Sequence, residues 1–326
     1  MKSKISILFL CLCIFFSACS DLQFQHIDGS AFGTYYAITY KGKANPTLQQ
    51  SVDSILKDLD NTFSVFNPSS MINKVNHNED IILNEDFLNV LNLSMEVADK
   101  TGGAFDITIE PLVELWGFGK DKRSTKITAE IIDSVKQHVG FHKIAVDKRK
   151  IVKEDSLIQL NFNAIAKGYA VDKIADFLVA KGYKNCIVDI GGEIVAKGKK
   201  YNDTEWNIGL QAPTVTRDGE MRASQTFHLK DQAVATSGNY RNYFEENGER
   251  YAHIIDPQTG YSEKSNLLSV SVIADHCVVA DAYATAFMVM GLEKTKSFLS
   301  IHPELSCIFI YDQHGELQTE YYNISK

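Results

Sequence analysis

The chain has little proline, no cluster of basic residues and no internal repeat. Its 326 residues include 6 prolines, and neither a proline-rich linker nor a low-complexity tract divides them. The formal net charge is −8 without any long run of lysine and arginine, which excludes the usual electrostatic footprint of a nucleic-acid-binding protein. With 44% hydrophobic and 23% charged residues, the composition is that of a globular protein with one large domain or two closely joined ones.

Cysteine is also sparse and shows no metal-binding spacing. Of the 6 cysteines, Cys186, Cys277 and Cys307 lie in the body of the chain. Cys186 and Cys307 belong to apolar, strand-like runs, so we interpret them as core residues rather than redox centres. One disulfide among the remaining cysteines stays open, because the N-terminus predicts an oxidising compartment.

The N-terminus has the pattern of a secretion signal. Lys2 and Lys4 precede the apolar segment Ile5–Phe16, which is shorter than the roughly 20 residues that a membrane-spanning helix needs. The next residues end in Cys19 and are similar to a bacterial lipobox, in which the cysteine becomes the first mature residue and carries the lipid. The alternative is a plain signal peptide in which Cys19 has no role. These expectations divide the chain into a lipoprotein signal peptide at 1–18, a tether at 19–27 and one domain at 28–326.

Helical and strand-like segments follow one another irregularly along that domain. The helical segments have apolar residues at helical spacing, and several have a capping residue at the start or a glycine at the end. Because helices and strands do not alternate regularly, we predict an α+β fold. Helices are expected at 47–61, 84–100, 128–139, 165–181 and 278–290, and strands at 31–40, 157–162, 186–190 and 267–274, with two more within 305–322.

A hairpin carrying a single histidine is predicted near residue 250. The strands Tyr240–Glu245 and Arg250–Ile255 flank Asn247-Gly248, a pair that favours the positive backbone angles of a tight turn. His253 lies in the second strand, which ends at the proline-initiated turn 256–260. This arrangement suits a phosphate-handling site, although an ordinary surface hairpin has the same pattern.

An acid and a hydroxyl lie one helical turn apart near residue 280. Asp281 and Thr285 share a helix face, where their oxygens would suit Mg²⁺. An unpaired carboxylate among the small and apolar neighbours of Asp281 would be costly. The alternative is that Asp281 lies near the helix start and only favours the helix dipole.

Two loops have features of ligand-binding segments. Asn161–Gly168 leads from a strand into a helix, where free backbone amides favour anions and Lys167 adds a positive charge. An ordinary strand–helix connection explains the same residues, since their spacing matches neither the dinucleotide fingerprint nor the P-loop. In Thr101–Asp106, two glycines allow close backbone approach and Phe105 offers a stacking face.

Two neighbouring segments are interpreted as structural. Trp116 and Phe118 lie in an aromatic, glycine-punctuated stretch and are expected in a local core. Asp189–Glu193 has the pattern of a strand end with a tight turn.

Taken together, these segments resemble the FAD:protein FMN transferases, the ApbE-like flavin transferases. The motifs occur in the same order as in the family over nearly the whole mature chain. Each motif alone is weak evidence, and the complete set is specific. The motifs are TGGAFDIT with PLVELWGFG, NAIAKGYAVD, VDIGGE, ATSGNYRNYF, HIIDPQTGY and the Asp281/Thr285 pair.

The resemblance implies an enzyme with the ApbE-like arrangement of sheets and packed helices. Such an enzyme binds FAD and a divalent metal, here Mg²⁺, and cleaves the pyrophosphate. It moves the FMN moiety to a threonine or serine hydroxyl of an acceptor protein and releases AMP. By position, His253 matches the proposed base, and Asp281, Thr285 and the carbonyl of Ala164 match the metal ligands. The residues matching flavin contacts are Phe32, Phe66, Ala104, Phe105, Asp106, Asn161, Lys167 and Ile255.

Three positions depart from the family pattern. Phe32 stands where the family usually has methionine before Gly-Thr, which keeps the surface apolar but changes its shape. Phe66 stands where tyrosine is frequent, at a position whose identity accompanies the balance between transfer and FAD hydrolysis. Asn161 replaces a frequent aspartate, so this position can donate and accept hydrogen bonds but carries no charge.

The resemblance also implies partners and a location. Known acceptors of the family are flavin-carrying subunits of membrane redox pumps and secreted flavoproteins, which suits an enzyme anchored by lipid in the cell envelope and facing the periplasm. Two alternatives use the same residues: an Mg²⁺-dependent FAD pyrophosphatase that yields FMN and AMP, and a non-catalytic flavin-binding lipoprotein.

Overall fold

The computed structural model of the protein describes residues 23–120, 127–215, 221–239, 243–246, 249–263 and 265–324. The predicted signal peptide at 1–18, the predicted lipidation site Cys19 and the predicted hairpin turn Asn247-Gly248 lie outside these residues. No helix in the described ranges is both long and apolar enough to cross a bilayer.

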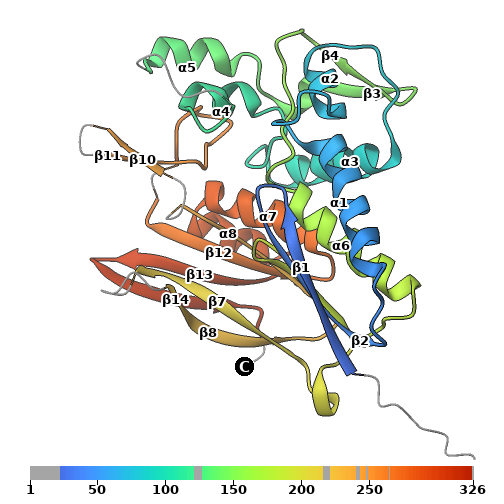
Figure 1. Ribbon diagram of the computed structural model, residues 1–326. Helices are drawn as coiled ribbons and strands as arrows, with labels where there is room; N and C mark the ends of the chain where they lie inside the picture. Colours follow the sequence, from blue (N-terminus) through green and yellow to red (C-terminus); the bar gives the residue numbers. More distant parts are fainter. Residues whose placement is uncertain are drawn as a thin grey trace, which may run out of the picture.

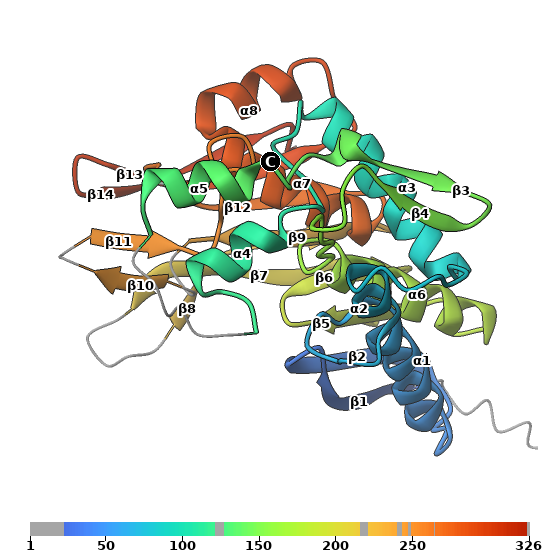
Figure 2. The same ribbon diagram turned by 90° about the horizontal axis from the view of Figure 1, so that it is seen from above.

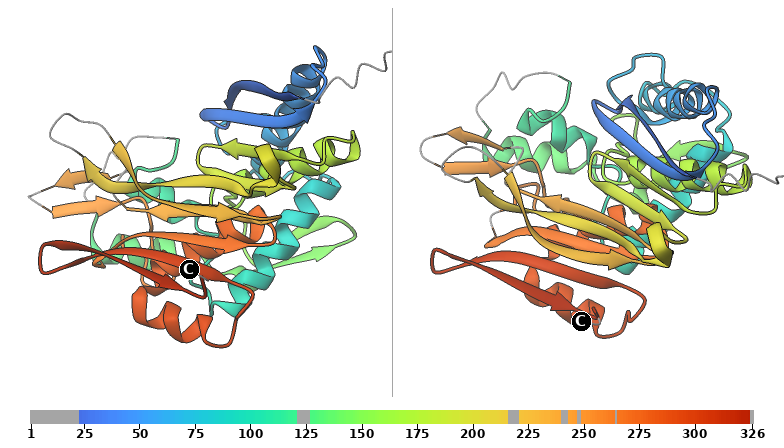
Figure 3. Two further views of the ribbon diagram at one scale, coloured as in Figure 1. Left: turned by 90° about the horizontal axis from the view of Figure 1, so that it is seen from below. Right: turned by 60° about the horizontal axis from the view of Figure 1, so that its bottom comes forward.

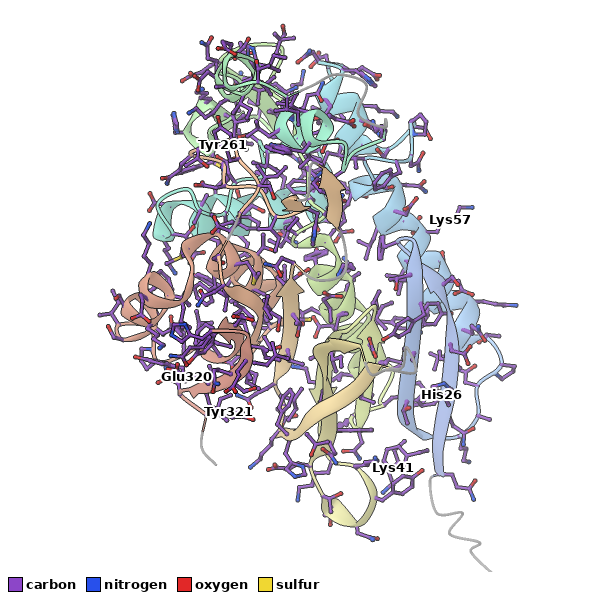
Figure 4. All side chains as sticks on the ribbon, turned by 90° about the vertical axis from the view of Figure 1, so that its left-hand side faces the viewer. His26, Lys41, Lys57, Tyr261, Glu320 and Tyr321 are labelled. Carbon is purple, nitrogen blue, oxygen red and sulfur yellow. The ribbon has the colours of Figure 1, made fainter. Side chains whose placement is uncertain are left out.

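The main sheet crosses the whole molecule. Within the described residues it has eight strands in the order β1-β2-β5-β6-β9-β12-β13-β14, and all neighbours are antiparallel. Figure 4 shows its two edges, with His26 and Lys41 on the β1–β2 side and Glu320 and Tyr321 of β14 on the opposite side. The strands are β1 (Gln23–Ala31), β2 (Thr34–Gly42), β5 (Cys186–Ile190), β6 (Glu193–Lys197), β9 (Ala233–Gly238), β12 (Leu267–Ala274), β13 (Ser306–Gln313) and β14 (Glu316–Tyr322).

Three antiparallel ribbons in the described part of the chain lie outside this sheet. The β10–β11 ribbon confirms the predicted histidine hairpin, but its second strand ends at Ala252, so His253 follows the strand instead of lying within it. The ribbons are β3 (Ile144–Asp147) with β4 (Lys150–Lys153), β7 (Trp206–Val215) with β8 (Met221–Leu229), and β10 (Tyr243–Glu246) with β11 (Glu249–Ala252).

Two of the helices begin at capping side chains that the sequence predicts. The side chain of Asn84 accepts a hydrogen bond from the amide of Phe87, and Thr128 accepts one from Ile131, so both predicted caps are confirmed. The helices are α1 (Leu48–Phe63), α2 (Met71–Asn76), α3 (Glu85–Lys100), α4 (Glu110–Trp116), α5 (Ala129–Lys136), α6 (Ala166–Ala180), α7 (Cys277–Met290) and α8 (Leu292–Leu299), with short 3-10 turns at Phe141–Lys143 and Tyr201–Asp203.

The two faces of the sheet are covered by different elements. Ala235 and Val272 belong to the large core under the helices, whereas their neighbours Val234 and Ile273 pack with Trp206 of the β7–β8 ribbon. This alternation follows from the two-residue period of a strand. Figure 1 shows the helices above the sheet and the ribbon below it, and Figure 3 shows the ribbon side from two further directions. Strands and helices that both contribute to one core confirm the α+β fold.

Three sequence-based boundaries are wrong. Residues 23–27, expected in a tether, belong to β1, which pairs along its whole length with β2. The strand expected at 31–40 begins at Thr34, because Phe32-Gly33 form the turn of this hairpin with positive φ angles. Residues 157–162 form no regular strand and make only a parallel bridge between Gln159 and Ile109.

The three described cysteines lie in the core, as the apolar sequence around Cys186 and Cys307 predicts. Cys186, Cys277 and Cys307 are buried and free, which confirms Cys186 and Cys307 as core residues and excludes a disulfide among the three. Burial raises the pKa of the Cys186 thiol to about 12, so this group stays protonated at neutral pH.

Candidate active site

One cleft of roughly 1290 Å³ collects the predicted site residues. Seen from above in Figure 2, α4, α5 and the β10–β11 ribbon lie on one side of the molecule, and α1, α2 and α6 lie on the other. Residues of both sides line the cleft. The predicted residues in its lining are Phe32, Phe66, Ala104, Phe105, Asp106, Asn161, Ala164, Lys167, His253, Ile255, Asp281 and Thr285. The structure brings them together, and the role of each stays a prediction.

The acid and the hydroxyl of the predicted metal site both face the cleft from α7. Asp281 is 4% exposed and lies beyond the first turn of the helix, so the alternative of a dipole-favouring surface residue does not apply. Its Oδ2 accepts a hydrogen bond from the amide of Gly168 at 2.9 Å. The Oγ1 of Thr285 lies 3.0 Å from the Oγ of Ser237 on β9.

Close packing between α6 and α7 sets the position of Asp281. A Cβ atom at Gly168 would lie 2.5 Å from the carbonyl oxygen of Cys277 and 2.7 Å from the Cβ of Asp281, so the contact requires glycine. One turn further along α6, the carboxylate of Asp172 accepts hydrogen bonds from the amides of Cys277 and Val278, each at 2.9 Å. These first amides of α7 have no partner within the helix, so Asp172 caps α7 from its neighbour.

A partly buried ion pair lies beside Asp281. The Nζ of Lys167 is 2.6 Å from Oε1 of Glu193, whose side chain is 4% exposed. Burial, together with the negative charge of Asp281, raises the pKa of Glu193 to about 7, although the charge of Lys167 lowers it. Burial also raises the pKa of Asp281, against Lys167 and the Gly168 amide. For Lys167, burial lowers the pKa, but the charges of Glu193 and Asp281 outweigh it and the net direction is upward.

The donor set fits a hard divalent cation. Oε2 of Glu193 is buried and has no hydrogen-bond partner among the described residues, a state that costs free energy unless a donor or a cation occupies the space beside it. The described ranges contain no group of three His, Cys, Asp or Glu side chains arranged as metal ligands. A cation at Asp281 and Thr285 would therefore keep water or phosphate ligands, as Mg²⁺ prefers.

His253 reaches the cleft from the opposite wall. Its ring contacts Phe118 of the segment after α4, with the ring centroids 6.3 Å apart at 71°. The backbone around it is held by a hydrogen bond from the Ser262 hydroxyl to the carbonyl of Ala252 and by one from the Glu263 amide to the carbonyl of Ile254. An imidazole in such a place can accept a proton from a hydroxyl bound in the cleft.

The turn after His253 is fixed by a separate small core. Ile255 packs with Leu112, Trp116 and other residues of α4 and α5. The indole Nε1 of Trp116 donates to the carbonyl of Gly260 at 2.8 Å, and the side chain of Gln258 donates to the carbonyl of Gly102. The glycine loop and the proline turn, which were separate in the sequence, are therefore joined at one end of the cleft. Figure 4 labels Tyr261 in this region.

Aromatic rings of unequal exposure line the cleft. Phe66 is 58% exposed and Phe32 is partly buried at the tip of the β1–β2 turn. Phe105 is only 2% exposed and belongs to the main core, so it supports the wall more than it offers a free stacking face. The expectation of a local core holds for Trp116, and Phe118 packs against the same cluster while it also lines the cleft.

Two polar residues of the wall are held by internal hydrogen bonds. The carboxylate of Asp106 accepts bonds from Thr108 and from the amide of Phe141, and burial raises its pKa against them. The amide nitrogen of Asn161 donates to Glu110, and its oxygen accepts from the amide of Asn163. Burial raises the pKa of Glu110 to about 7, against the bond from Asn161. Asn161 therefore has a fixed orientation in the cleft.

Sequence reasoning missed Glu193, Ser237 and Tyr35 as parts of the site. All three line the cleft. Glu193 follows a tight turn in which Gly191 and Gly192 have positive φ angles, and this turn was interpreted as structural. The signal that could have identified Glu193 is an acidic residue at the start of a buried strand, where it needs a partner.

Known proteins with this pattern were identified by sequence and by structure. The model of the ApbE family matches residues 32–309. The FAD:protein FMN transferase of Vibrio cholerae is 35% identical over 277 residues, which cover 82% of this chain and 82% of that protein. That of Haemophilus influenzae is 34% identical over 310 residues, covering 90% of this chain and 89% of that protein.

Solved structures give the same result. The flavin transferase ApbE from Vibrio cholerae superposes with a TM-score of 0.84 at 30% identity, covering 92% of this chain and 97% of that structure. The apo form of the Pseudomonas stutzeri flavinyl transferase ApbE has a TM-score of 0.82 at 30% identity, with coverages of 92% and 95%. The chain therefore belongs to the ApbE family.

Proposed function

We propose that this protein is an FAD:protein FMN transferase that moves the FMN moiety of FAD to a threonine or serine hydroxyl of an acceptor protein and releases AMP. The observation that carries the proposal is the single cleft in which the flavin-contact positions, the Asp281/Thr285 pair and His253 meet. Its volume of roughly 1290 Å³ suits a dinucleotide, since pockets for smaller ligands are about 300–1,000 Å³. The named relatives have the same activity.

The residues of the cleft divide the reaction between two walls. The hydroxyl oxygen of the acceptor attacks the phosphorus of the FMN half, and the bond from this phosphorus to the oxygen shared with AMP breaks, so that AMP leaves with the electron pair. His253 accepts the hydroxyl proton at its imidazole. Lys167 neutralises charge on the pyrophosphate, and the aromatic rings at Phe32 and Phe66 cover the isoalloxazine.

The metal fits this division. Asp281 and Thr285, together with the carbonyl of Ala164, would hold Mg²⁺ against the phosphates. When bound, the ion supplies Lewis-acid stabilisation of several kcal/mol to the charge that develops during transfer.

Mass spectrometry of an acceptor tests the proposal. The protein is incubated with FAD, Mg²⁺ and an acceptor domain that carries a suitable threonine, next to a matched acceptor in which that threonine is alanine. We expect the mass of one FMN moiety on the first acceptor only, with AMP released in equal amount. Free FMN with AMP and no adduct would identify a pyrophosphatase, and the absence of AMP would identify a flavin-binding protein.

We also propose that Cys19 carries lipid and anchors the enzyme in the cell envelope, facing the periplasm. The proposal is supported by the lipobox-like residues before Cys19. Replacement Cys19→Ser is expected to move the protein from the membrane fraction to the soluble fraction, because the lipid chains supply the membrane affinity. The check is fractionation followed by immunoblotting, with Cys186→Ser as the control, and unchanged membrane retention of the Cys19 variant would contradict the anchor.

A further inference from the structure

Glu193 has two carboxylate oxygens in very different situations. Oε1 forms an ion pair with the Nζ of Lys167 at 2.6 Å. Oε2 is buried and has no hydrogen-bond partner among the described residues. The side chain lines the cleft from β6, next to the wall formed by α6 and α7. Neither the transfer step nor the predicted ligand set of the metal uses this residue.

The charges around Glu193 explain why a buried carboxylate belongs at this place. Lys167 interacts electrostatically with both Glu193 and Asp281, and Asp281 interacts with Glu193. With Glu193 present, Lys167 is balanced and the negative charge of Asp281 is left for a cation. Without it, only Asp281 would balance the ammonium of Lys167, and this ammonium would repel a cation bound at Asp281.

The free oxygen adds a second contribution. At a site with few protein ligands, Mg²⁺ and Mn²⁺ keep several bound water molecules. Carboxylates that do not contact the metal commonly accept hydrogen bonds from its ligands. Oε2 of Glu193 is enclosed in the cleft wall, and its unused acceptor capacity suits this contact.

We propose that Glu193 is a positioning residue for the cation: it neutralises Lys167, so that Asp281 keeps its charge for the metal, and Oε2 accepts a hydrogen bond from a metal-bound water. This inference rests on the cation site in the proposed function. It predicts that Lys167 competes with the metal for Asp281 whenever Glu193 is lost.

Binding of Mn²⁺ to the metal-free protein at pH 8 without FAD tests this coupling, with electron paramagnetic resonance reporting the free ion. The variants are Glu193→Gln, Lys167→Met, the double variant and Asp281→Ala. Asp60→Asn is the control, because this carboxylate lines the same cleft from α1. We expect Glu193→Gln to weaken Mn²⁺ binding by about tenfold or more, in line with the effect of outer-shell carboxylates elsewhere.

The opposite change in Mn²⁺ affinity is expected when the positive charge of Lys167 is removed. Lys167→Met should strengthen Mn²⁺ binding by at least about threefold, and the double variant should return to within about threefold of the wild type. Asp60→Asn should bind as the wild type does. An affinity of Glu193→Gln within twofold of the wild type, or a double variant as weak as Glu193→Gln alone, would overturn the inference.

The set of variants distinguishes an error in the role of Glu193 from an error in the position of the cation site. If Asp281→Ala binds Mn²⁺ as the wild type does, the metal assignment in the proposed function is wrong. If Asp281→Ala abolishes binding and Glu193→Gln does not weaken it, only the role of Glu193 is wrong. Circular dichroism checks folding; should Glu193→Gln not fold, unchanged Mn²⁺ affinity of Lys167→Met is the result that overturns the inference.

Discussion

The two walls of the cleft are built in different ways. On one wall, Asp281 and Lys167 belong to helices that pack on the main sheet and share its large core. On the other, His253 follows a two-stranded ribbon and is followed by Ile255, which packs in a small separate core with α4 and α5. The first wall buries the carboxylates of Asp281 and Glu193, and the second presents a partly exposed imidazole.

This difference matches the demands of the two proposed tasks, metal binding and proton transfer. A cation between phosphates needs oxygens fixed to within a fraction of an ångström, which closely packed helices supply. A base that serves an acceptor protein must be reachable from outside the cleft, and the imidazole of His253 is partly exposed. We therefore expect changes in the first wall to remove activity through the metal and changes in the second to remove it through proton transfer.

The largest effect is expected for Asp281→Ala, which removes the one carboxylate predicted to bind the metal directly. Loss of several kcal/mol of Lewis-acid stabilisation corresponds to at least about a hundredfold lower FAD turnover. The measurement is AMP release over a Mg²⁺ titration. Asp275→Ala, an exposed carboxylate just before α7, is the control and should be unchanged. Normal turnover of Asp281→Ala at limiting Mg²⁺ would contradict the metal assignment.

The next effect is expected for His253→Ala on the other wall. Loss of a general base lowers turnover by roughly 10²–10⁴-fold, while the affinity for FAD should change by less than about threefold. Single-turnover transfer and fluorescence titration with FAD measure the two quantities. The exposed His77→Ala serves as the comparison. Transfer at the wild-type rate by His253→Ala would show that another group takes the proton.

A smaller effect is expected for Asp172→Asn, which weakens the cap that joins α6 to α7. Asparagine has only one acceptor oxygen and no charge, so one of the two amides at the start of α7 loses its hydrogen bond. The free energy of unfolding should fall by about 1–2 kcal/mol. Urea denaturation measures this change. Asp176→Asn, exposed on the same helix, should be neutral. Equal stabilities of the two variants would show that the cap is energetically unimportant.

An effect on stability of similar size is expected from the pH dependence of Glu110 beside Asn161. The folded-state pKa of about 7 lies above the ordinary value of 4.5, so the folded protein keeps a proton that the unfolded chain has lost. The contribution of Glu110 to stability therefore falls as pH rises from about 4.5 to about 7. Glu110→Gln removes this loss, and its free energy of unfolding relative to wild type should rise by on the order of 2 kcal/mol between pH 4.5 and pH 8. A constant difference across this range, from urea denaturation, would contradict the shift.

The sequence predicted best where local signals and tertiary structure agree. Strands 186–190 and 267–274 have the predicted bounds, and the caps at Asn84 and Thr128 form as expected, because buried runs and capping side chains act locally. β1 was missed because its alternating polar residues resemble a tether, and only pairing with β2 makes it a strand.

The site residues that belong to a family motif could be predicted from the sequence. The resemblance supplied the residues that line the cleft, including His253 and Asp281. Glu193 and Phe118 were not recognised as site residues, because the partners of their side chains come from distant parts of the sequence. Neither the Lys167 ion pair nor the His253 ring contact has any signature in local spacing.

The most direct test of the two-walled account is a crystal structure with FAD and Mn²⁺, in which anomalous scattering locates the metal. The account predicts a peak at about 2.2 Å from oxygens of Asp281 and Thr285, in contact with the pyrophosphate, with His253 facing the same phosphorus from the opposite side. A metal peak away from α7, or a flavin bound outside this cleft, would contradict it.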